Sequence, residues 1–163
     1  MYRLLRAIGF RFEPERAHRM ALRAVRLTRP LRRQRRYEGD PVELFGLHFR
    51  NRLGLAAGYD KDGSAWQGLA ALGFGHVEVG TVTPRPQSGN PRPRVHRLPE
   101  HKALINRMGF PSAGVDAIAS RLTAERRPGV VLGVSIGPNA DTPQERRIDD
   151  YLLLIDRLTD RAD

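Results

Sequence analysis

Cysteine is absent from this sequence of 163 residues, and lysine occurs only twice, against 26 arginines. Without cysteine, the chain forms neither a disulfide framework nor a cysteine-based metal site. The five histidines show no spacing typical of metal ligands, so we expect no metal. No apolar run approaches the roughly 20 residues that a membrane-spanning helix needs. The arginines within residues 1–12 argue against a secretory signal.

The net positive charge is concentrated at one end of the chain. Residues 1–36 carry twelve arginines and two glutamates, whereas residues 37–163 carry sixteen cations and sixteen anions. The chain therefore divides into a basic module, residues 1–36, and an electrically balanced body, residues 37–163.

The basic module has the pattern of two short amphipathic helices. The first apolar stripe consists of Leu4, Leu5 and Ile8. After the start signal Glu13-Pro14-Glu15, apolar residues recur at helical spacing as far as Pro30: Ala17, Met20, Ala21, Ala24 and Val25. Such helices with many arginines favour an anchor that lies on a membrane surface. Packing against the body is the alternative, and nucleic acid is disfavoured because few aromatic rings are present for base stacking.

Strand and helix patterns alternate in the body. A polar linker, Arg32–Asp40, leads to a hairpin over residues 42–49 that turns at Gly46. The expected strands are Leu53–Ala57, His76–Thr81 and Val130–Ile136, and the expected helices are Ser64–Leu72, Ser112–Leu122 and Pro143–Leu158. This alternation predicts an α/β fold with a parallel sheet. We interpret Thr83–Arg107, which contains five prolines and five arginines, as a long loop that carries the site.

Polar groups follow the three predicted strands at their carboxyl ends, where α/β sheets bind ligands. These segments are Ala57–Lys61, Gly80–Thr83 and Ser135–Asn139, and Asn106–Phe110 adds an amide and a cation. In a chain so rich in arginine, Lys61 indicates a tight position that faces an anion. Amides, hydroxyls, an ammonium group and bare main chain suit a planar, hydrogen-bonding, anionic ligand.

The carboxylates near these segments have simpler interpretations. Asp60 and Asp62 flank Lys61 and are typical of turns and helix caps. Glu78 lies between Val77 and Val79, so we expect it to face the interior of the fold and to form a structural ion pair. We find neither a Ser-His-Asp arrangement nor a phosphate-loop fingerprint.

Several motifs resemble class 2 (quinone-dependent) dihydroorotate dehydrogenases. The runs that carry this resemblance are Glu13–His18, Gly54–Gly63, Gly80–Arg94, Ile105–Phe110 and Gly137–Pro143. The resemblance implies the N-terminal portion of a (β/α)8 TIM barrel, about three βα units, preceded by a small two-helix membrane-associating module. It also implies oxidation of dihydroorotate to orotate with FMN and ubiquinone, in de novo pyrimidine (UMP) biosynthesis. The expected location is peripheral, on the cytoplasmic face of the cell (inner) membrane.

The resemblance assigns roles to residues of this chain. The residues implied to bind FMN are Ala57, Gly58, Tyr59, Asp60, Lys61, Thr81 and Ser135. The residues implied to bind the substrate are Lys61, Asn106, Arg107, Met108, Gly109 and Phe110, and His18 and Arg97 match positions near the quinone tunnel. Strand-end packing is the alternative for Thr81, a turn role is the alternative for Asn106, and a solvated surface position is the alternative for Lys61.

Three positions depart from the family pattern. Ser135 replaces the usual flavin-binding asparagine, Pro138 replaces a lysine, and His96 stands where an aromatic or apolar residue is common. The catalytic serine base is expected beyond Asp163, so the resemblance implies a fragment that is inactive alone. Two alternatives remain: a non-catalytic basic module that binds membrane or nucleic acid, and another flavin-barrel oxidoreductase, which the run at Asn106 disfavours.

Overall fold

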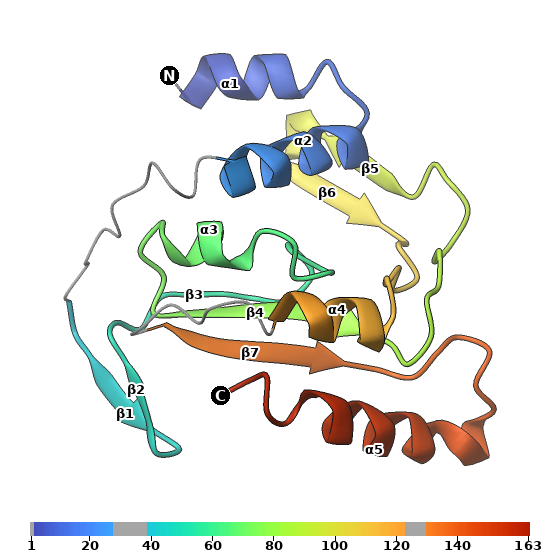
Figure 1. Cartoon of the computed structure of the whole chain (residues 1–163). Helices are drawn as coiled ribbons and strands as arrows, with labels where there is room; N and C mark the ends of the chain where they lie inside the picture. Colours follow the sequence, from blue (N-terminus) through green and yellow to red (C-terminus); the bar gives the residue numbers. More distant parts are fainter. Residues whose placement is uncertain (1, 28–38, 123–129) are drawn as a thin grey trace.

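The structure, a computed structural model, describes residues 2–27, 39–122 and 130–163 (Figure 1). The predicted linker Arg32–Asp40 lies outside the described residues except for its last two.

A parallel three-stranded sheet forms the centre of the body. Its strands are β3 (Gly54–Leu55), β4 (His76–Val82) and β7 (Val131–Ile136), in the order β3-β4-β7. The predicted parallel sheet is therefore confirmed, although β3 is shorter than the expected Leu53–Ala57. Val77 and Val79 of β4 are completely buried, because this strand lies between the other two and is covered by helices.

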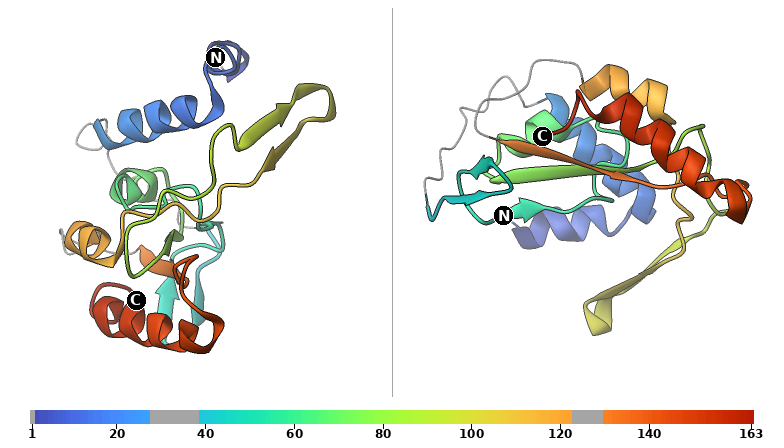
Figure 2. Two further views of the ribbon diagram at one scale, coloured as in Figure 1. Left: turned by 90° about the vertical axis from the view of Figure 1, so that its right-hand side faces the viewer. Right: turned by 90° about the horizontal axis from the view of Figure 1, so that it is seen from below.

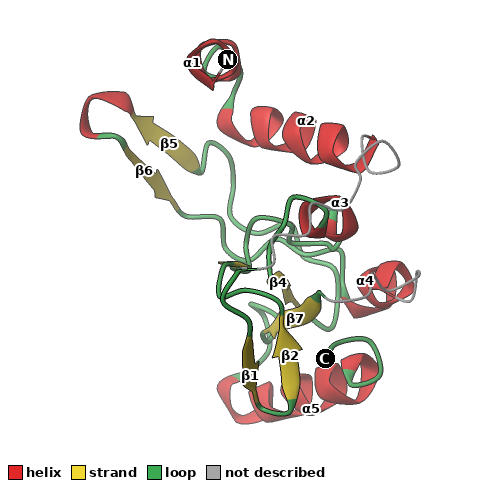
Figure 3. Ribbon diagram, turned by 90° about the vertical axis from the view of Figure 1, so that its left-hand side faces the viewer, coloured by secondary structure: helices red, strands yellow, loops and turns green. Residues whose placement is uncertain are grey.

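Three helices lie along one side of the sheet, as Figure 3 shows: α3 (Trp66–Ala70), α4 (Val115–Leu122) and α5 (Arg147–Leu158). Their apolar faces and the sheet form a single core that includes Trp66, Val77, Ile118, Leu122, Leu132, Leu154 and Leu158. The alternating strand and helix pattern thus placed these elements correctly, because each buries one apolar face against the next layer.

Each helix begins later than its sequence pattern predicts. Ala65, with φ −131° and ψ 4°, is not helical, so α3 begins at Trp66. Gly114 has φ +84°, which delays the start of α4 to Val115. The expected helix from Pro143 is divided into a 3₁₀ turn, η3 (Gln144–Arg146), and α5.

The predicted hairpin is present as β1 (Val42–Leu44) and β2 (Leu47–Phe49). Phe45 and Gly46, with φ +55° and +75°, form its two-residue turn, which confirms the turn expected at Gly46. The hairpin lies at the amino-terminal ends of the sheet strands (Figure 1), opposite the end where ligands bind in such folds.

Both predicted N-terminal helices are present, as α1 (Tyr2–Gly9) and α2 (Pro14–Leu27). They lie at the top of the molecule in Figure 1, and α2 contacts α3 and the strand β5. The approach of α2 to α3 is close: a Cβ atom at Gly68 would lie 2.6 Å from the carbonyl oxygen of Val25. None of the helices in the described parts of the chain is both long enough and apolar enough to span a membrane.

The segment Thr83–Arg107 is not the plain loop that we predicted. It contains an antiparallel hairpin, β5 (Val95–Leu98) and β6 (Ala103–Asn106), joined through a 3₁₀ turn, η2 (Pro99–His101). The prolines flank the strands without interrupting them, so they are compatible with a hairpin. The left view of Figure 2 shows that this hairpin extends away from the body on the side of α1 and α2.

Candidate functional site

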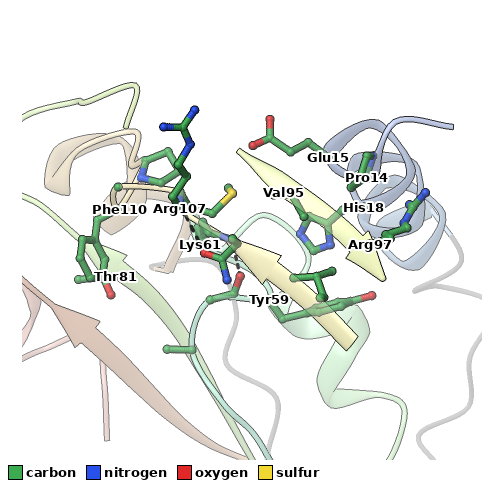
Figure 4. A pocket seen from close by; sticks show the side chains of 17 residues that line it. Pro14, Glu15, His18, Tyr59, Lys61, Thr81, Val95, Arg97, Arg107 and Phe110 are labelled. Carbon is green, nitrogen blue, oxygen red and sulfur yellow. Dashed lines mark hydrogen bonds between the residues drawn. The ribbon is translucent and has the colours of Figure 1, made fainter. Parts of the chain in front are cut away.

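A cavity of about 750 Å³ lies where the carboxyl end of the sheet meets α2 and the β5–β6 hairpin (Figure 4). Its lining residues come from five separate segments of the chain: Pro14, Glu15, His18, Ala57, Gly58, Tyr59, Lys61, Thr81, Val95, Arg97, Leu104, Asn106, Arg107, Met108, Gly109, Phe110 and Pro111. The cavity therefore brings together all of the residues that the resemblance implies for binding FMN, substrate and quinone, except Asp60 and Ser135.

Lys61 is half-buried in this cavity. Its Nζ donates a hydrogen bond of 2.5 Å to the carbonyl oxygen of Gly58, in the turn that follows β3. Burial lowers the pKa of Lys61, whereas the negative charges of Glu15 and Asp62 act in the opposite direction. The solvated-surface alternative for Lys61 is therefore not supported, because its ammonium group is held at the cavity wall.

Asp60 supports this turn through hydrogen bonds and does not line the cavity. Its completely buried carboxylate accepts hydrogen bonds from the main-chain N–H groups of Ser64, at 2.9 Å, and Ala65, at 2.7 Å. The carboxylate of Asp62 accepts one from the N–H group of Ala113, at 2.9 Å. Asp60 thus serves its local turn, as one interpretation of the sequence expected, whereas Asp62 connects its turn to the segment before α4. The predicted cofactor role of the Asp60 side chain gains no support from its position.

Gly58 presents bare main chain to the cavity. Its φ is +94°, and a Cβ atom built there would meet no atom within 4 Å, so the space in front of it is open. Its N–H group donates a hydrogen bond of 2.9 Å to Gly80, which fixes the turn against β4. A planar ring can approach such a surface closely. This bare main chain, the ammonium group of Lys61 and the hydroxyl of Thr81 together form a set of groups that a flavin would fit.

Thr81 and Ser135 meet at the ends of β4 and β7. Their hydroxyl oxygens lie 3.1 Å apart, within hydrogen-bond distance. Thr81 lines the cavity, whereas Ser135 does not. A serine hydroxyl is shorter than an asparagine amide, so the departure from the family pattern at this position leaves the side chain directed at Thr81.

The segment Asn106–Phe110 forms a second wall of the cavity, and all five of its residues line it. Gly109 has φ +70°, and a Cβ atom there would lie 2.8 Å from the main-chain nitrogen and side chain of Asn90. Asn106 accepts a hydrogen bond from the N–H group of Met108 at 3.4 Å, so its predicted alternative, a turn role, is also present. The segment is therefore held tightly while its polar groups face the cavity.

His18 and Arg97 occupy the side of the cavity formed by α2 and the hairpin. The His18 ring contacts the Tyr59 ring edge to face, with centroids 4.8 Å apart. Burial lowers the pKa of His18, and the nearby charge of Lys61 lowers it further. Arg97 donates a hydrogen bond of 2.8 Å to Phe12 and lies over the ring of Phe10. The predicted quinone residues thus share one cavity with Lys61.

The sequence interpretation missed Glu15 and was wrong about the contact of Glu78. Glu15 was included in the start signal of a helix and in the run Glu13–His18, without a role at the site, yet it is a buried carboxylate in the cavity wall. Glu78 forms no ion pair within the described parts of the chain, and its carboxylate instead accepts a hydrogen bond of 3.2 Å from the N–H group of Ala57. Over the same residues, no group of three His, Asp or Glu side chains could hold a metal ion.

Comparison with known proteins places this site in a family. The family model described as dihydroorotate dehydrogenase matches residues 41–163. The chain is 52% identical over 159 residues to a dihydroorotate dehydrogenase (quinone) from Aromatoleum aromaticum, and 50% identical over 173 residues to one from Roseiflexus. These alignments cover 97% and 100% of this chain, but 45% and 48% of the relatives, so the chain spans about half of their length.

A solved structure agrees with the sequence comparisons. The crystal structure of DHODH from Eimeria tenella in complex with ferulenol matches with a TM-score of 0.81 and 39% identity, over 92% of this chain and 42% of that one. The three βα units are accordingly the first part of a (β/α)8 barrel, as predicted. The chain is similar in sequence to relatives named dihydroorotate dehydrogenase (quinone), and it belongs to the dihydroorotate dehydrogenase family.

Proposed function

We propose that the full-length protein oxidises dihydroorotate to orotate with FMN and passes the electrons to ubiquinone, in de novo UMP synthesis. The observation that supports this most directly is the shared cavity, in which Lys61 lies between Asn106–Phe110 and the pair His18 and Arg97. One cavity could therefore serve both dihydroorotate, which supplies the electrons, and ubiquinone, which accepts them. The identity of about 50% to quinone-dependent enzymes supports the same conclusion.

When bound, FMN supplies a ring that can accept a hydride from the substrate and then pass the electrons to the quinone. The residues that would hold it are the bare main chain of Ala57 and Gly58, the ammonium group of Lys61 and the hydroxyl of Thr81. Lys61 brings a positive charge to a half-buried position, where it favours an electron-rich ring and an anionic substrate.

The substrate would lie against Asn106–Phe110. Dihydroorotate presents a carboxylate and a cyclic diamide, and this chain offers the cations of Lys61 and Arg107 for the former and the amide of Asn106 for the latter. The apolar atoms of Met108 and Phe110 line the cavity and would cover part of the bound substrate. The residues named here bind and orient the substrate, whereas the proton acceptor remains the serine that the family resemblance implies.

The N-terminal helices would meet the membrane that supplies the quinone. Leu4, Leu5 and Ile8 of α1 are 66%, 60% and 47% exposed, although they are large apolar side chains. The arginines beside them attract anionic lipid headgroups. An amphipathic helix of this kind lies in the interface, so we infer peripheral attachment to the cytoplasmic face of the inner membrane. Such attachment would direct the side of the cavity formed by α2, with His18 and Arg97, toward the lipid phase.

The activity is tested on the purified full-length protein. We expect it to contain bound flavin, to lose the flavin absorbance when dihydroorotate is added without oxygen, and to reduce a soluble ubiquinone analogue only when dihydroorotate is present. A protein that binds no flavin, or that reduces the quinone at the same rate without dihydroorotate, would contradict the proposal. We expect a polypeptide of these 163 residues alone to show no turnover.

A second experiment separates membrane attachment from nucleic-acid binding, which the charge of residues 1–36 would also allow. The full-length protein is mixed with vesicles that contain anionic lipid and with a DNA duplex, at low and at moderate salt. Preferential binding to the vesicles is expected, because the exposed face of α1 is apolar as well as basic. Binding to DNA alone would favour the alternative.

A further inference from the structure

Glu15 is a buried carboxylate that connects α2 to the loop before the β5–β6 hairpin. Its Oε1 accepts a hydrogen bond of 2.5 Å from Nε of Arg94, a residue that lies 79 positions further along the chain. Glu15 is 7% exposed and Arg94 is 6% exposed. Nε of Arg92 lies 2.5 Å from the other carboxylate oxygen, but the Arg92 side chain is mostly in solvent. Figure 4 shows the side chain of Glu15 at the margin of the cavity.

Arg94 uses its remaining donors to hold the main chain around it. Its Nη1 donates hydrogen bonds to the carbonyl oxygens of Ser88, at 2.6 Å, Asn90, at 3.0 Å, and Met108, at 3.4 Å. One guanidinium group therefore joins the turn at 88–90 to the cavity wall at 108.

Asn90 completes this connection. Its N–H group donates to the carbonyl oxygen of Met108 at 2.9 Å, and its side-chain amide donates to that of Arg107 at 2.8 Å. The N–H group of Arg107 in turn donates to the carbonyl oxygen of Arg94 at 2.8 Å. The segment Asn106–Phe110 thus takes its position from the turn that Arg94 holds.

A buried guanidinium group is stable only when its charge is paired. Within this cluster the buried partner of Arg94 is Glu15, on a helix that belongs to the N-terminal module. If the carboxylate is neutralised, Arg94 is a buried charge without a full counter-charge, and the favourable response is movement toward water. Such movement would release the carbonyl oxygens of Ser88, Asn90 and Met108 together.

We propose that Glu15 is a positioning residue for the dihydroorotate site, which acts through Arg94 to hold Asn106–Phe110 in its binding conformation. The inference rests on the proposed function, and it assigns to α2 a role in substrate affinity in addition to its place beside the quinone residues. Glu15 itself is not expected to touch the substrate.

The test compares Glu15→Gln with Glu13→Gln in the full-length protein. Glu13 is the matched control: it is an exposed carboxylate at the start of the same helix, and it accepts hydrogen bonds from the N–H groups of Glu15 and Arg16 without contacting Arg94. The dissociation constant of orotate and the rate of flavin reduction by dihydroorotate are measured, followed by reoxidation by a ubiquinone analogue.

For Glu15→Gln we expect orotate binding to weaken about tenfold or more, because a hydrogen bond to a charged group is worth about 1.5–3 kcal/mol and every 1.4 kcal/mol is a factor of ten. The KM for quinone should change by less than about twofold, and Glu13→Gln should leave orotate binding within that same range. An unchanged orotate affinity in Glu15→Gln, or an equal loss in Glu13→Gln, would overturn the proposal.

Two further measurements show whether Glu15 acts through Arg94. In an Arg94→Gln background, the additional change Glu15→Gln should alter orotate affinity by less than about twofold, because the intermediary is already missing. Amide hydrogen exchange should also rise in residues 88–110 of Glu15→Gln, at Asn90 and Arg107 above all, while the sheet strands keep their protection. Additive losses, or unchanged exchange in residues 88–110, would contradict the mechanism.

Two safeguards keep the test decisive. If Glu15→Gln does not fold, Glu15→Asp retains the charge one methylene group further from Arg94 and should give a smaller loss in the same direction; no loss would count against the proposal. If the wild-type protein shows no dihydroorotate-dependent flavin reduction, the proposed function fails, whereas the exchange experiment still tests the link from Glu15 to residues 88–110.

Discussion

Replacement of Lys61 by alanine tests the centre of the site most directly. The ammonium group is half-buried, donates to the carbonyl oxygen of Gly58 at 2.5 Å, and is placed to face an anionic ligand. Its removal costs the charge-assisted hydrogen bond to that ligand, worth about 1.5–3 kcal/mol. We therefore expect kcat/KM for dihydroorotate to fall roughly 10- to 150-fold, at 1.36 kcal/mol for each factor of ten.

The assay is anaerobic stopped-flow measurement of flavin absorbance after mixing the full-length protein with dihydroorotate. Flavin content is determined first, so that a loss of cofactor is distinguished from a loss of reactivity. A Lys61→Ala protein that retains flavin and is reduced at a rate within about threefold of wild type would refute the role assigned to Lys61.

Lys61→Arg provides the sharper control, because it keeps the charge and changes the shape. The space beside Gly58 accommodates a compact ammonium group, whereas a guanidinium group is a wide planar fork. We expect less than about a tenth of the wild-type rate of flavin reduction from this variant. Full activity would show that charge alone matters and that the scarcity of lysine in this chain has no bearing on the site.

Three other predictions concern stability, pH and shape. Asp60→Ala should lower the free energy of unfolding by about 2–4 kcal/mol, because two main-chain N–H groups lose their acceptor inside the turn; an unchanged Tm by calorimetry would contradict this. Burial lowers the pKa of His18 in the folded protein, so as the pH falls the unfolded chain binds a proton at this imidazole before the folded protein does. The contribution of His18 to the free energy of unfolding should therefore be constant above about pH 6.5 and decrease below it. His18→Gln should flatten this dependence of Tm on pH, and an unaltered slope would count against it. Gly109→Ala should weaken orotate binding about tenfold, because its Cβ would lie 2.8 Å from Asn90. The control Gly46→Ala has a similar φ but open space around its Cβ, so it should leave orotate binding unchanged. Equal effects of the two substitutions on orotate binding would exclude the steric explanation.

Residues close in the sequence explain most of the predictions that the structure confirms. The helices α1 and α2 and the alternation of β4, α4 and β7 follow from apolar periodicity in short stretches of sequence, and the turn follows from Gly46. Lys61 was notable by composition alone, and the structure places it at the cavity wall after β3. Local patterns suffice in these cases because each element buries one face whatever its partner is.

The β5–β6 hairpin shows where local patterns fail. Its strands have four residues each, and Val95–Leu98 has apolar side chains only at its two ends, with His96 and Arg97 between them, and prolines on either side. The ladder between Val95 and Asn106 stabilises these strands only once both are formed, so neither is evident alone. A segment rich in proline was therefore interpreted as a loop.

The sequence by itself determined the type of fold, the family, and the residues of the two cavity walls, because their motifs are contiguous and local. Only the tertiary structure decided which of them share one cavity and what holds them there. The pairing of Glu15 with Arg94, 79 residues apart, depends on how α2 packs over the body, and no periodicity encodes that distance. The same packing buries Glu15 at the start of its helix and makes it the counter-charge of Arg94. An unpaired guanidinium group is costly when buried, whereas in solvent its charge is hydrated by water.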